Sequence, residues 1–407
     1  MELVDVLDSN GKRLNEVVDK DKAHKEGIFH PVVHIVVLSK DRSRILLQKR
    51  CSNKKIYPNM WDIAAAGHIS SGEESIISAK REFNEELGLD SNNYDFKYVG
   101  YFLETYDYKN YKVREYSHTY VIIDDIDINS IKVQDEEVSD VRWFNKKEFN
   151  KLVEDKKLVK HEFYDYINDL MDKYFVFKDF NNDEILSLYS KKPMNCNVSK
   201  EDKDLLIEEI ERDLDYKFKR VVGSKFQVHG NDVVIVEDIN QEIGEVDGFL
   251  TNLKGIALEI RTADCQSIFL YDPVKKVIGN VHSGWKGTYK QIVIKAINKM
   301  IEHYGCNKND IRVGINPSIL GCCFEVKDDV INLFKEICDV DKYMKPYEDK
   351  YLLDTVSINY DKLIDKGIKK EHIYLSNICT GCNTIEYHSY RKENKTEGRN
   401  ISIICLK

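Results

Sequence analysis

Residues 67–89 read GHISSGEESIISAKREFNEELGL, and this stretch decides the fold of the first half of the chain. From Ser71 to Leu87 it is polar with apolar residues at helical spacing, which predicts one helix that packs a narrow face. On that helix Glu82, Glu85 and Glu86 present carboxylates that converge and repel one another unless a cation lies between them. Such an oxygen-rich site suits Mg²⁺ or Mn²⁺, which keep water ligands and bridge phosphates.

The sequence around this helix predicts a sheet. Two β-branched apolar runs between Pro31 and Arg50 flank a polar turn and predict a hairpin. Further strands are expected at 96–103 and 116–123, and near-helical spacing over 148–174 predicts a helical end to the domain. The polar stretch KDFNNDE, residues 178–184, is the candidate boundary region.

The fixed positions of residues 67–89 resemble the Nudix box, and all of them are filled. The resemblance implies a hydrolase in which Mg²⁺ or Mn²⁺ polarises a phosphate and water attacks phosphorus, releasing a monophosphate from a nucleoside diphosphate linked to another group. Arg81 and Glu73 are expected to pair and hold the geometry. The implied metal ligands are Glu82, Glu85, Glu86 and the Gly67 carbonyl, and the implied catalytic residues are Glu85, Glu86, Arg81 and Glu73.

Two alternatives to a Nudix hydrolase were weighed. A run of four glutamates and an arginine is usually a solvated helix face, but Gly67, Gly72 and Gly88 at the family's positions argue against that. The context also resembles the Nudix subgroup related to isopentenyl-diphosphate isomerase, on Leu3–Asp8, His30, Lys49-Arg50, Tyr57-Pro58 and Trp61-Asp62. The isomerase needs a cysteine immediately before the position of His68, where this chain has glycine, so hydrolysis is favoured. His30, His34 and His68 are interpreted as ordinary structural residues.

The second half alternates strands and helices, an α/β pattern without a dinucleotide-binding glycine motif. Thr288 to Gln291 matches a capping box and predicts a helix that runs from there to about Tyr304. Strands are expected at 233–236, 257–260, 268–271, 277–281, 311–315 and 401–405.

Three segments of the second half, residues 227–232, 262–265 and 281–288, resemble the YfiH-type family, known first as laccase-domain or polyphenol oxidase proteins and now as purine nucleoside phosphorylases. Spacing alone does not make His229, Cys265 and His282 a metal site. The resemblance implies that they are zinc ligands. One thiolate and two imidazoles leave a fourth position open, which is typical of catalytic zinc.

The same resemblance implies phosphorolysis of purine nucleosides such as adenosine, inosine and methylthioadenosine, and deamination of adenosine by attack of zinc-activated water on the purine. Asp264 is expected to act in catalysis, and Gln227 and Arg399 to bind substrate. We expect the Thr288 helix to present its N-terminus to phosphate near the metal. The plain alternative is that these are buried structural polar residues.

Two other metal chemistries were considered for the second half. Two histidines and a cysteine also describe a blue-copper centre, but none of the 11 histidines forms the HxH pairs that a multicopper laccase needs. The zinc-deaminase signature H-x-E with P-C-x-x-C is absent too. Cys379-x-x-Cys382 is a single CxxC, too little for a structural zinc site, and it is interpreted with the adjacent Cys322-Cys323 as a structural feature.

Length and composition agree with a small-molecule enzyme of two domains. At 407 residues the chain exceeds one ordinary core. We predict an α/β and α+β protein: a Nudix α/β/α sandwich over residues 1–175, then a YfiH-type mixed-sheet α/β domain over 176–407. With 61 basic against 70 acidic residues, a net charge of −9 predicts no nucleic-acid or membrane partner. The expected partners are nucleotides, nucleosides and phosphate.

The chain is expected to be cytoplasmic. No apolar run approaches the roughly 20 residues of a membrane span, the start is too polar for a signal peptide, and ten cysteines are too sparse for a disulfide scaffold. The combined hypothesis is a bifunctional enzyme with Mg²⁺ in the first domain and Zn²⁺ in the second. Its rivals are a second domain that acts on a cell-wall precursor and a first domain that senses a ligand. The Nudix substrate, the preferred nucleoside and the oligomeric state stay open.

Overall fold

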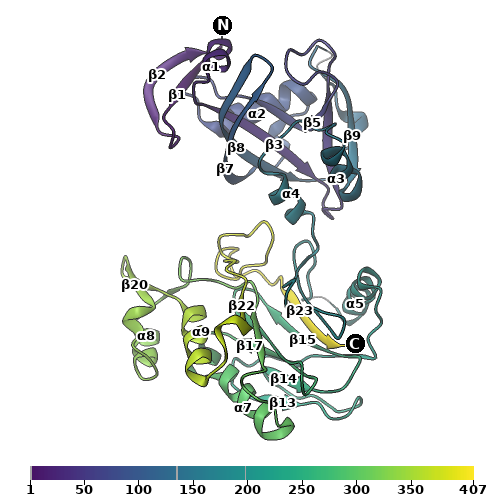
Figure 1. Ribbon diagram of the computed structural model, residues 1–407, viewed down its shortest axis with the longest axis vertical. Coiled ribbons are helices and arrows are strands. Elements are labelled where there is room, and N and C mark those ends of the chain that lie inside the picture. Colours follow the sequence, from purple (N-terminus) through teal and green to yellow (C-terminus); the bar gives the residue numbers. More distant parts are fainter. Residues whose placement is uncertain (1, 134–135, 198) are drawn as a thin grey trace. The chain divides into compact units, whose positions relative to one another are not determined.

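The computed structural model describes residues 2–133, 136–197 and 199–407. The chain divides into two compact units, Met1–Asp172 and Lys173–Lys407. Both units combine mixed sheets with helices, which confirms the predicted fold class (Figure 1). In the described part of the chain, no helix is both long and apolar enough to span a membrane.

The first unit is built on a mixed sheet. Its central strand, β3, is buried along its whole length because its β-branched residues fill the core on both faces. It pairs in parallel with β8 and antiparallel with β4 and β6. The strand order is β5 (Trp61–Ile63), β4 (Arg44–Arg50), β3 (His30–Leu38), β8 (Tyr111–Ile123) and β7 (Lys97–Tyr108), with β6 (Ala65–His68) on β3 and β9 (Val138–Asn145) on β4.

The predicted helix is α2 (Ser75–Leu87), which buries Ala79, Phe83 and Leu87 against this sheet. It ends at Gly88, whose left-handed backbone lets its N–H bond to the carbonyl of Asn84. The predicted hairpin is β3 and β4. A separate hairpin, β1 (Leu3–Leu7) and β2 (Arg13–Asp19), precedes the short helix α1 (Lys20–Glu26).

The expected helical end of the first unit is interrupted. It consists of α3 (Lys146–Glu154) and α4 (Tyr164–Leu170), with an extended segment between them. The backbone of that segment bonds to Trp61 from both Lys157 and Val159. The sheet edge therefore takes these residues out of the helix, and the segment carries His161 into the interior.

The second unit stacks two sheets between helices. The first sheet has the order β10 (Tyr174–Phe175), β11 (Ile185–Ser190), β23 (Asn400–Leu406), β15 (Ile256–Thr262), β12 (Arg220–Val222). The second has the order β13 (Val233–Ile235), β14 (Gly248–Thr251), β17 (Val277–Ser283), β16 (Gln266–Asp272), β18 (Arg312–Ile315), β22 (Ile373–Leu375). All six predicted strands of this half are present.

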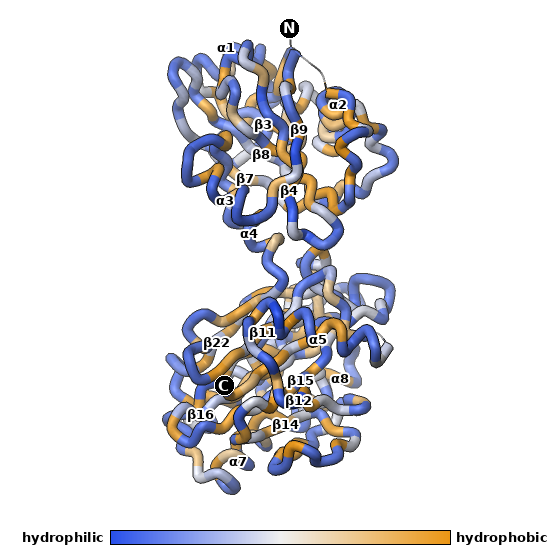
Figure 2. Tube along the Cα trace, turned by 90° about the vertical axis from the view of Figure 1, so that its right-hand side faces the viewer, coloured by the Kyte–Doolittle hydropathy of each residue, from blue (hydrophilic) through white to orange (hydrophobic). Residues whose placement is uncertain are grey.

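Three apolar clusters hold these layers together. Phe249, Phe269 and Tyr271 belong to the core shared by the two sheets. Helices α7 (Ile292–Tyr304) and α9 (Thr355–Lys366) cover the outer face of the second sheet, and α5 (Lys200–Leu214) covers the first. Figure 2 shows hydrophobic residues concentrated along the inner strands and hydrophilic ones along the loops. A small sheet of β19 (Glu325–Val326), β21 (Lys350–Leu353) and β20 (Met344–Tyr347) packs with α8 (Asp328–Lys335).

Two local expectations for this half are corrected. The helix predicted to begin at Thr288 is split into α6 (Trp285–Tyr289) and α7, because Gln291 has a left-handed backbone and caps nothing with its side chain. The Thr288 hydroxyl bonds to Ser283 instead of capping a helix. The stretch 178–184 lies inside the second unit, since Phe180 is in its core. The predicted boundary at 175/176 stays a prediction.

Candidate functional site

The acidic cluster of the first unit forms where β6 meets α2. Glu82 and Glu86 are buried on the inner face of α2, whereas the side chain of Glu85 is half exposed. Glu86 accepts hydrogen bonds from Gln48 Nε2 at 2.6 Å and from the backbone N–H of Ala66 at 3.2 Å. A Cβ at Gly67 would lie 2.0 Å from Cδ of Glu82, so only glycine lets the strand approach this carboxylate.

Arg81 ties the cluster to the loop before it. Its guanidinium lies 2.6 Å from Glu82 Oε1, 3.5 Å from Glu85 Oε2 and 3.7 Å from Glu73 Oε2. It also donates to the carbonyl of His68 at 3.2 Å. The structure thus places the sequence-predicted residues of this half together, with the Arg81–Glu82 contact shorter than the expected Arg81–Glu73 pair.

Burial shifts the pKa values of two acids in this cluster upward. Burial raises the pKa of Glu82 to about 7, against the opposing effect of Arg81. Burial and the neighbouring Glu82 raise the pKa of Glu86 to about 8. A divalent cation would reverse this by stabilising the ionised carboxylates, so the donor set fits Mg²⁺ or Mn²⁺.

A second group of metal-ligating side chains was missed by the sequence reasoning. Ligand atoms of His24, His30, His68 and Glu115 all lie within 4.8 Å of one another. Nε2 of His24 is 3.1 Å from Nε2 of His68, and Glu115 Oε1 is 3.8 Å from His24 and from His30. Burial lowers the pKa of His30 to about 4, so the ring is neutral, as a metal ligand must be. We name this group the histidine cluster.

Sheet register brings the histidine cluster together. His30 faces Glu115 across β3 and β8, and Val32 faces His68 across β3 and β6. The two members that pair, His30 and Glu115, are far apart in sequence, so spacing carries no signal. Among described atoms, the buried Nε2 of His30 has no hydrogen-bond partner.

A buried histidine, His161, forms a network of charged hydrogen bonds with two buried carboxylates in the same unit. His161 bonds to Glu104 Oε1 at 3.0 Å and to Asp62 Oδ1 at 2.9 Å. Burial opposes protonation of His161, but the two carboxylates outweigh it and raise its pKa to about 10. Burial likewise opposes ionisation of Asp62, yet His161 lowers its pKa to about 2. Arg50 completes the network, 3.1 Å from Asp62.

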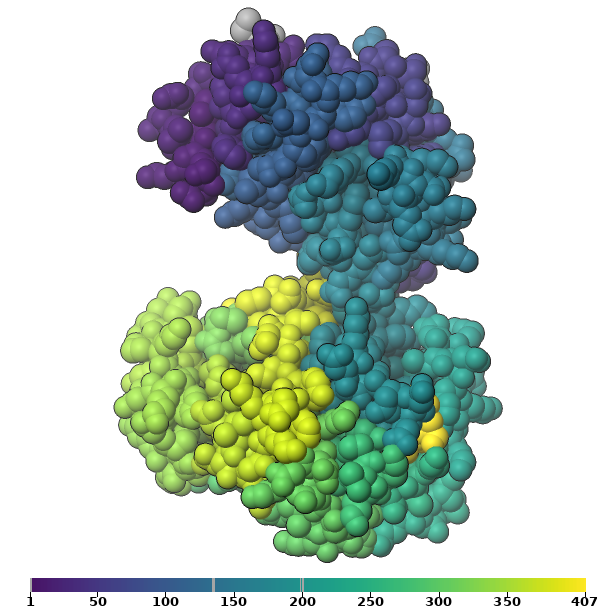
Figure 3. All heavy atoms as spheres, viewed as in Figure 1, coloured from purple at the N-terminus to yellow at the C-terminus, as the bar shows by residue number. Residues whose placement is uncertain are grey.

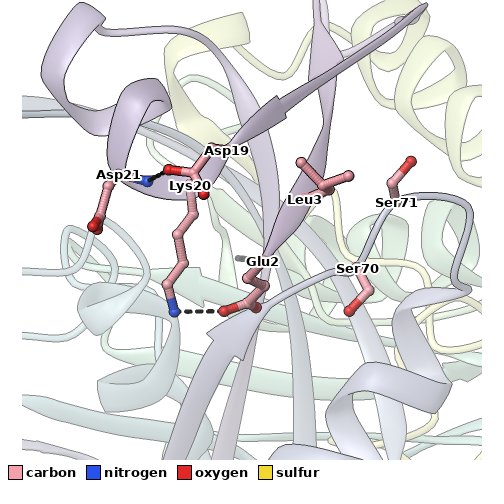
Figure 4. Close-up of a pocket in the computed structure, with 7 residues that line it drawn as sticks. All are labelled: Glu2, Leu3, Asp19, Lys20, Asp21, Ser70 and Ser71. Carbon is pink, nitrogen blue, oxygen red and sulfur yellow. Dashed lines mark hydrogen bonds and ion pairs between the residues drawn. The ribbon is translucent and has the colours of Figure 1, made fainter.

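One cavity of about 590 Å³ joins the acidic cluster, the histidine cluster and the His161 network. Arg50 and Lys54 add positive charge to its wall. A shallow recess beside it shares Glu2, Lys20 and Ser70 with the cavity. Figure 4 shows Lys20 extended across this recess to Glu2, with 2.5 Å between Nζ and Oε2. The arrangement offers two cation positions and basic side chains suited to a diphosphate.

The second unit brings together His229, Cys265 and His282, whose ligand atoms lie within 4.8 Å of one another. Cys265 immediately precedes β16, and His282 is on the paired strand β17. Cys265 Sγ is 4.0 Å from Nε2 of His229, close to the roughly 3.6 Å expected for sulfur and nitrogen on one tetrahedral zinc. A Cβ at Gly284 would lie 3.1 Å from Cys265 Sγ and 3.0 Å from His229, so glycine keeps this space open.

Asp247 positions both histidines, a role that sequence reasoning missed. Its carboxylate lies 2.8 Å from Nδ1 of His282 and accepts the backbone N–H groups of His229 and Gly230. The register that pairs Gly248 with Val281 puts Asp247 beside His282. The sequence alone does not show this pairing, so it could not reveal the role of Asp247. Such a carboxylate fixes the ring so that Nε2 faces a metal.

Electrostatics favour a thiolate at this site. Burial alone would raise the pKa of Cys265, but hydrogen bonds with His229 and His282 outweigh burial and lower it to about 6. Burial opposes protonation of His282, yet the bond with Asp247 raises its pKa to about 9. Zinc binding would displace the proton of His282, and the thiolate and two neutral imidazoles would then fit zinc.

The other predicted residues of this half occupy different positions. Gln227 lies at the cavity wall, but both ends of its amide bond to the backbone of Arg261. Asp264 is buried, and its carboxylate accepts from Thr380 Oγ1 and the backbone N–H of Arg391, both at 2.7 Å. Arg399 lines the cavity with its guanidinium 6.0 Å from the ring of Tyr390.

The histidines and the cysteine open on a cavity of about 570 Å³. Two aromatic side chains at its wall, Phe226 and Tyr390, are 59% and 45% exposed. Lys225, Arg261 and Arg399 also line it. Flat apolar faces beside cations suit a ligand that has an aromatic base and an anion.

These features define a two-unit α/β protein with a cluster of carboxylates in one unit and a thiolate–imidazole group in the other. Residues 186–407, more than half of the chain, match the family described as multi-copper polyphenol oxidoreductase laccase, and the chain belongs to this family. Residues 28–166 match the NUDIX domain.

Curated relatives cover both parts. The chain is 34% identical over 247 residues to a purine nucleoside phosphorylase of Clostridium acetobutylicum, covering 58% of this chain and 98% of that protein. A purine nucleoside phosphorylase of Bacillus subtilis is 36% identical over 40% of this chain and 59% of its own length. Nudix hydrolase 3 of Arabidopsis thaliana is 33% identical over 36% of this chain but only 19% of its own length.

The crystal structure of a Bacillus licheniformis YfiH protein aligns with 55% of this chain and 93% of its own, at 26% identity and a TM-score of 0.51. The family description names a multi-copper oxidoreductase that acts on polyphenols, whereas the curated relatives are named purine nucleoside phosphorylases.

Proposed function

We propose that the second unit cleaves purine nucleosides by phosphorolysis. The observation that carries this proposal is the His229, Cys265 and His282 group at a cavity with two exposed aromatic side chains and three cations. The names of the curated relatives support it.

In the reaction, a phosphate oxygen bonds to C1′ of ribose as the bond from C1′ to the purine nitrogen breaks, and the purine leaves with a proton. Zinc, when bound, supplies a Lewis acid. Phe226 and Tyr390 would stack on the base, and Arg399 and Lys225 would hold phosphate. Asp247 keeps His282 in one orientation. Asp264, proposed from sequence as catalytic, would act by holding the chain before Cys265.

Adenosine deamination is the second activity proposed for this cavity. There water adds at the purine carbon that bears the amino group, and ammonia leaves to give inosine. The zinc site supports it, because zinc can activate water as well as polarise a substrate.

The test is chromatography of adenosine incubated with the full chain, with and without phosphate. Adenine and ribose 1-phosphate that depend on phosphate would establish phosphorolysis, and inosine alone would assign deamination. His229→Ala should remove either product, whereas His303→Ala, a half-exposed histidine outside the cavity, should keep it. Intact adenosine with zinc bound would overturn the purine assignment and favour an amide of a cell-wall precursor.

We also propose that the first unit is a Mg²⁺-dependent diphosphate hydrolase of the subgroup related to isopentenyl-diphosphate isomerase. Glu82, Glu85, Glu86 and the Gly67 carbonyl would hold Mg²⁺, which polarises a phosphate. Arg81 keeps Glu82 in place, and Glu86 is held by Gln48. The histidine cluster lines the same cavity and would supply a second cation position.

A panel of nucleoside diphosphate derivatives and isopentenyl diphosphate tests this. Release of a monophosphate that is lost in Glu86→Gln and kept in Glu74→Gln, an exposed residue at the start of α2, supports hydrolysis. Conversion of isopentenyl to dimethylallyl diphosphate would assign isomerisation instead. Ligand binding without turnover across the panel would favour a sensor.

A further inference from the structure

Four cysteines that the proposed function does not use meet at one place in the second unit. Cys322 and Cys323 lie in the turn after β18, and Cys379 and Cys382 lie in the loop after β22. A backbone bridge between Ser318 and Cys379 joins the two segments. Figure 3 shows the lime-green and yellow parts of the chain, which contain these segments, side by side on the surface of this unit. Sequence spacing gave only one CxxC, because the other pair comes from a distant turn.

The distances among these four thiols match a single tetrahedral metal. All four sulfur atoms lie within 4.8 Å of one another. Cys382 Sγ is 3.5 Å from Sγ of Cys322 and 3.4 Å from Sγ of Cys323. Zn–S bonds of about 2.3 Å place tetrahedral sulfur ligands roughly 3.8 Å apart, whereas a disulfide needs about 2.05 Å. Sγ of Cys382 is also almost equally distant from two sulfur atoms, whereas a disulfide would bring it close to only one.

The backbone around the thiols is built for close approach. The N–H of Leu320 donates to Cys379 Sγ at 3.4 Å, a bond that stabilises a thiolate. The N–H of Cys382 bonds to the carbonyl of Cys379 and closes the CxxC turn. A Cβ at Gly381 would lie 3.0 Å from Cβ of Cys323, so glycine at this position lets the two segments meet.

We propose that Cys322, Cys323, Cys379 and Cys382 form a structural zinc site that is separate from the His229, Cys265 and His282 group. Four thiolates close the coordination sphere, as in structural rather than catalytic zinc. Zinc is the preferred occupant because soft thiolates in tetrahedral arrangement select it over Mg²⁺ or Mn²⁺. On binding, each thiol loses its proton to solvent as a sulfur–metal bond forms, and no redox step is involved.

The site would fasten the loops that hold Asp264. Thr380, inside the CxxC, donates to the Asp264 carboxylate, and the backbone N–H of Ile319, in the other segment, donates to its carbonyl at 2.9 Å. Asp264 has a left-handed backbone with φ of 84° and immediately precedes Cys265. Metal in the tetrathiolate site would therefore stabilise the backbone that presents Cys265.

Metal content of the full chain and of paired variants tests the proposal. We expect Cys379→Ser/Cys382→Ser to bind one zinc fewer per chain than the wild type, and His229→Ala/His282→Ala to lose one zinc at the other site. Cys338→Ser, a partly buried cysteine that bonds to the carbonyl of Phe334, is the matched control and should bind as much zinc as the wild type. Because the test compares differences between variants, any zinc that the histidine cluster of the first unit binds contributes equally to each and cancels.

Cobalt substitution tests the site in a chain that keeps all four cysteines. Its result therefore does not depend on how well the double cysteine variant folds. In the folded His229→Ala/His282→Ala chain, Co²⁺ should produce the intense thiolate-to-cobalt absorption of a tetrathiolate site, reduced by the single change Cys322→Ser at an exposed ligand. The first unit contributes only Cys51 to such absorption. Equal zinc in the cysteine variants and the wild type would overturn the proposal. So would a disulfide among these four cysteines in chain purified without reductant, with no metal bound.

Discussion

The acidic cluster of the first unit and the thiolate site of the second shift the pKa values of their acidic groups in opposite directions. On α2, burial raises the pKa of Glu82 to about 7 and that of Glu86 to about 8, which favours the protonated form of each acid. Beside β16, two histidines lower the pKa of Cys265 to about 6, so the thiolate forms beforehand. The oxygen ligands of the first site suit a hard cation under the proposed function, and the thiolate of the second suits a softer one.

The two sites also differ in how the chain assembles them. Three glutamates come from one helix, where residues three and four apart lie on the same side. His229 and Cys265 come from two loops and His282 from a strand, and Asp247 bonds to both histidines. Damage to one site should therefore leave the other intact, and damage to a supporting residue should matter more in the second.

The largest expected effect separates the two activities. His282→Ala removes a predicted zinc ligand that is 2% exposed, and the loss of several kcal/mol of transition-state stabilisation corresponds to roughly 10³-fold in purine turnover. Diphosphate hydrolysis by the same preparation should stay unchanged. Parallel assays of both reactions check this. An equal fall in both would mean that the variant damages the whole chain rather than one site.

We expect Gly67→Ala to lower the turnover of diphosphate hydrolysis by the first unit by about 10²-fold, which is comparable with the loss of one preorganised group. The added Cβ displaces the Glu82 carboxylate, a flexible side-chain end, so the fold should survive. Titration with Mn²⁺ should show weaker binding, and thermal unfolding should change little. Gly244→Ala, where an added Cβ meets nothing within 4 Å, is the control. Unaltered Mn²⁺ affinity in Gly67→Ala would separate Gly67 from the metal site.

Asp247→Asn should lower zinc affinity by about 10- to 100-fold, the usual cost of losing a partner that orients a metal ligand. Asparagine keeps the shape but loses the charge that raises the pKa of His282. Competition with a chromogenic chelator measures the affinity. An affinity equal to that of the wild type would mean that the backbone, not Asp247, sets the orientation of His282.

Sequence reasoning succeeded where contacts are local. The helix that carries Glu82 and Glu86, the strand that follows Cys265 and the strand that carries His282 are each predicted from patterns of a few residues. It was wrong about the helix at Thr288, because the capping pattern competes with a hydroxyl bond to Ser283 and a left-handed Gln291. A local motif cannot report such a tertiary contact.

The groups that sequence reasoning missed all depend on long-range pairing. His30 meets Glu115 through the β3–β8 register, and Cys323 meets Cys382 through two loops of one unit. Asp247 reaches His282 only because β14 pairs with β17. A shift of one residue in either strand pair would turn the side chains to the other face of the sheet, so their positions require the fold itself.

The smallest expected effect concerns stability and pH in the first unit. The folded-state pKa of His161, about 10, lies above its ordinary 6.5, so its contribution is complete below pH 6.5 and is lost as pH rises through about 10. The slope is at most about 1.4 kcal/mol per pH unit for one proton. The gap in unfolding free energy between the wild type and His161→Gln should shrink over that range. Denaturant unfolding at several pH values measures the gap. A gap that stays constant with pH would mean that His161 is neutral in the folded chain and that the carboxylates of Glu104 and Asp62 are balanced by other groups.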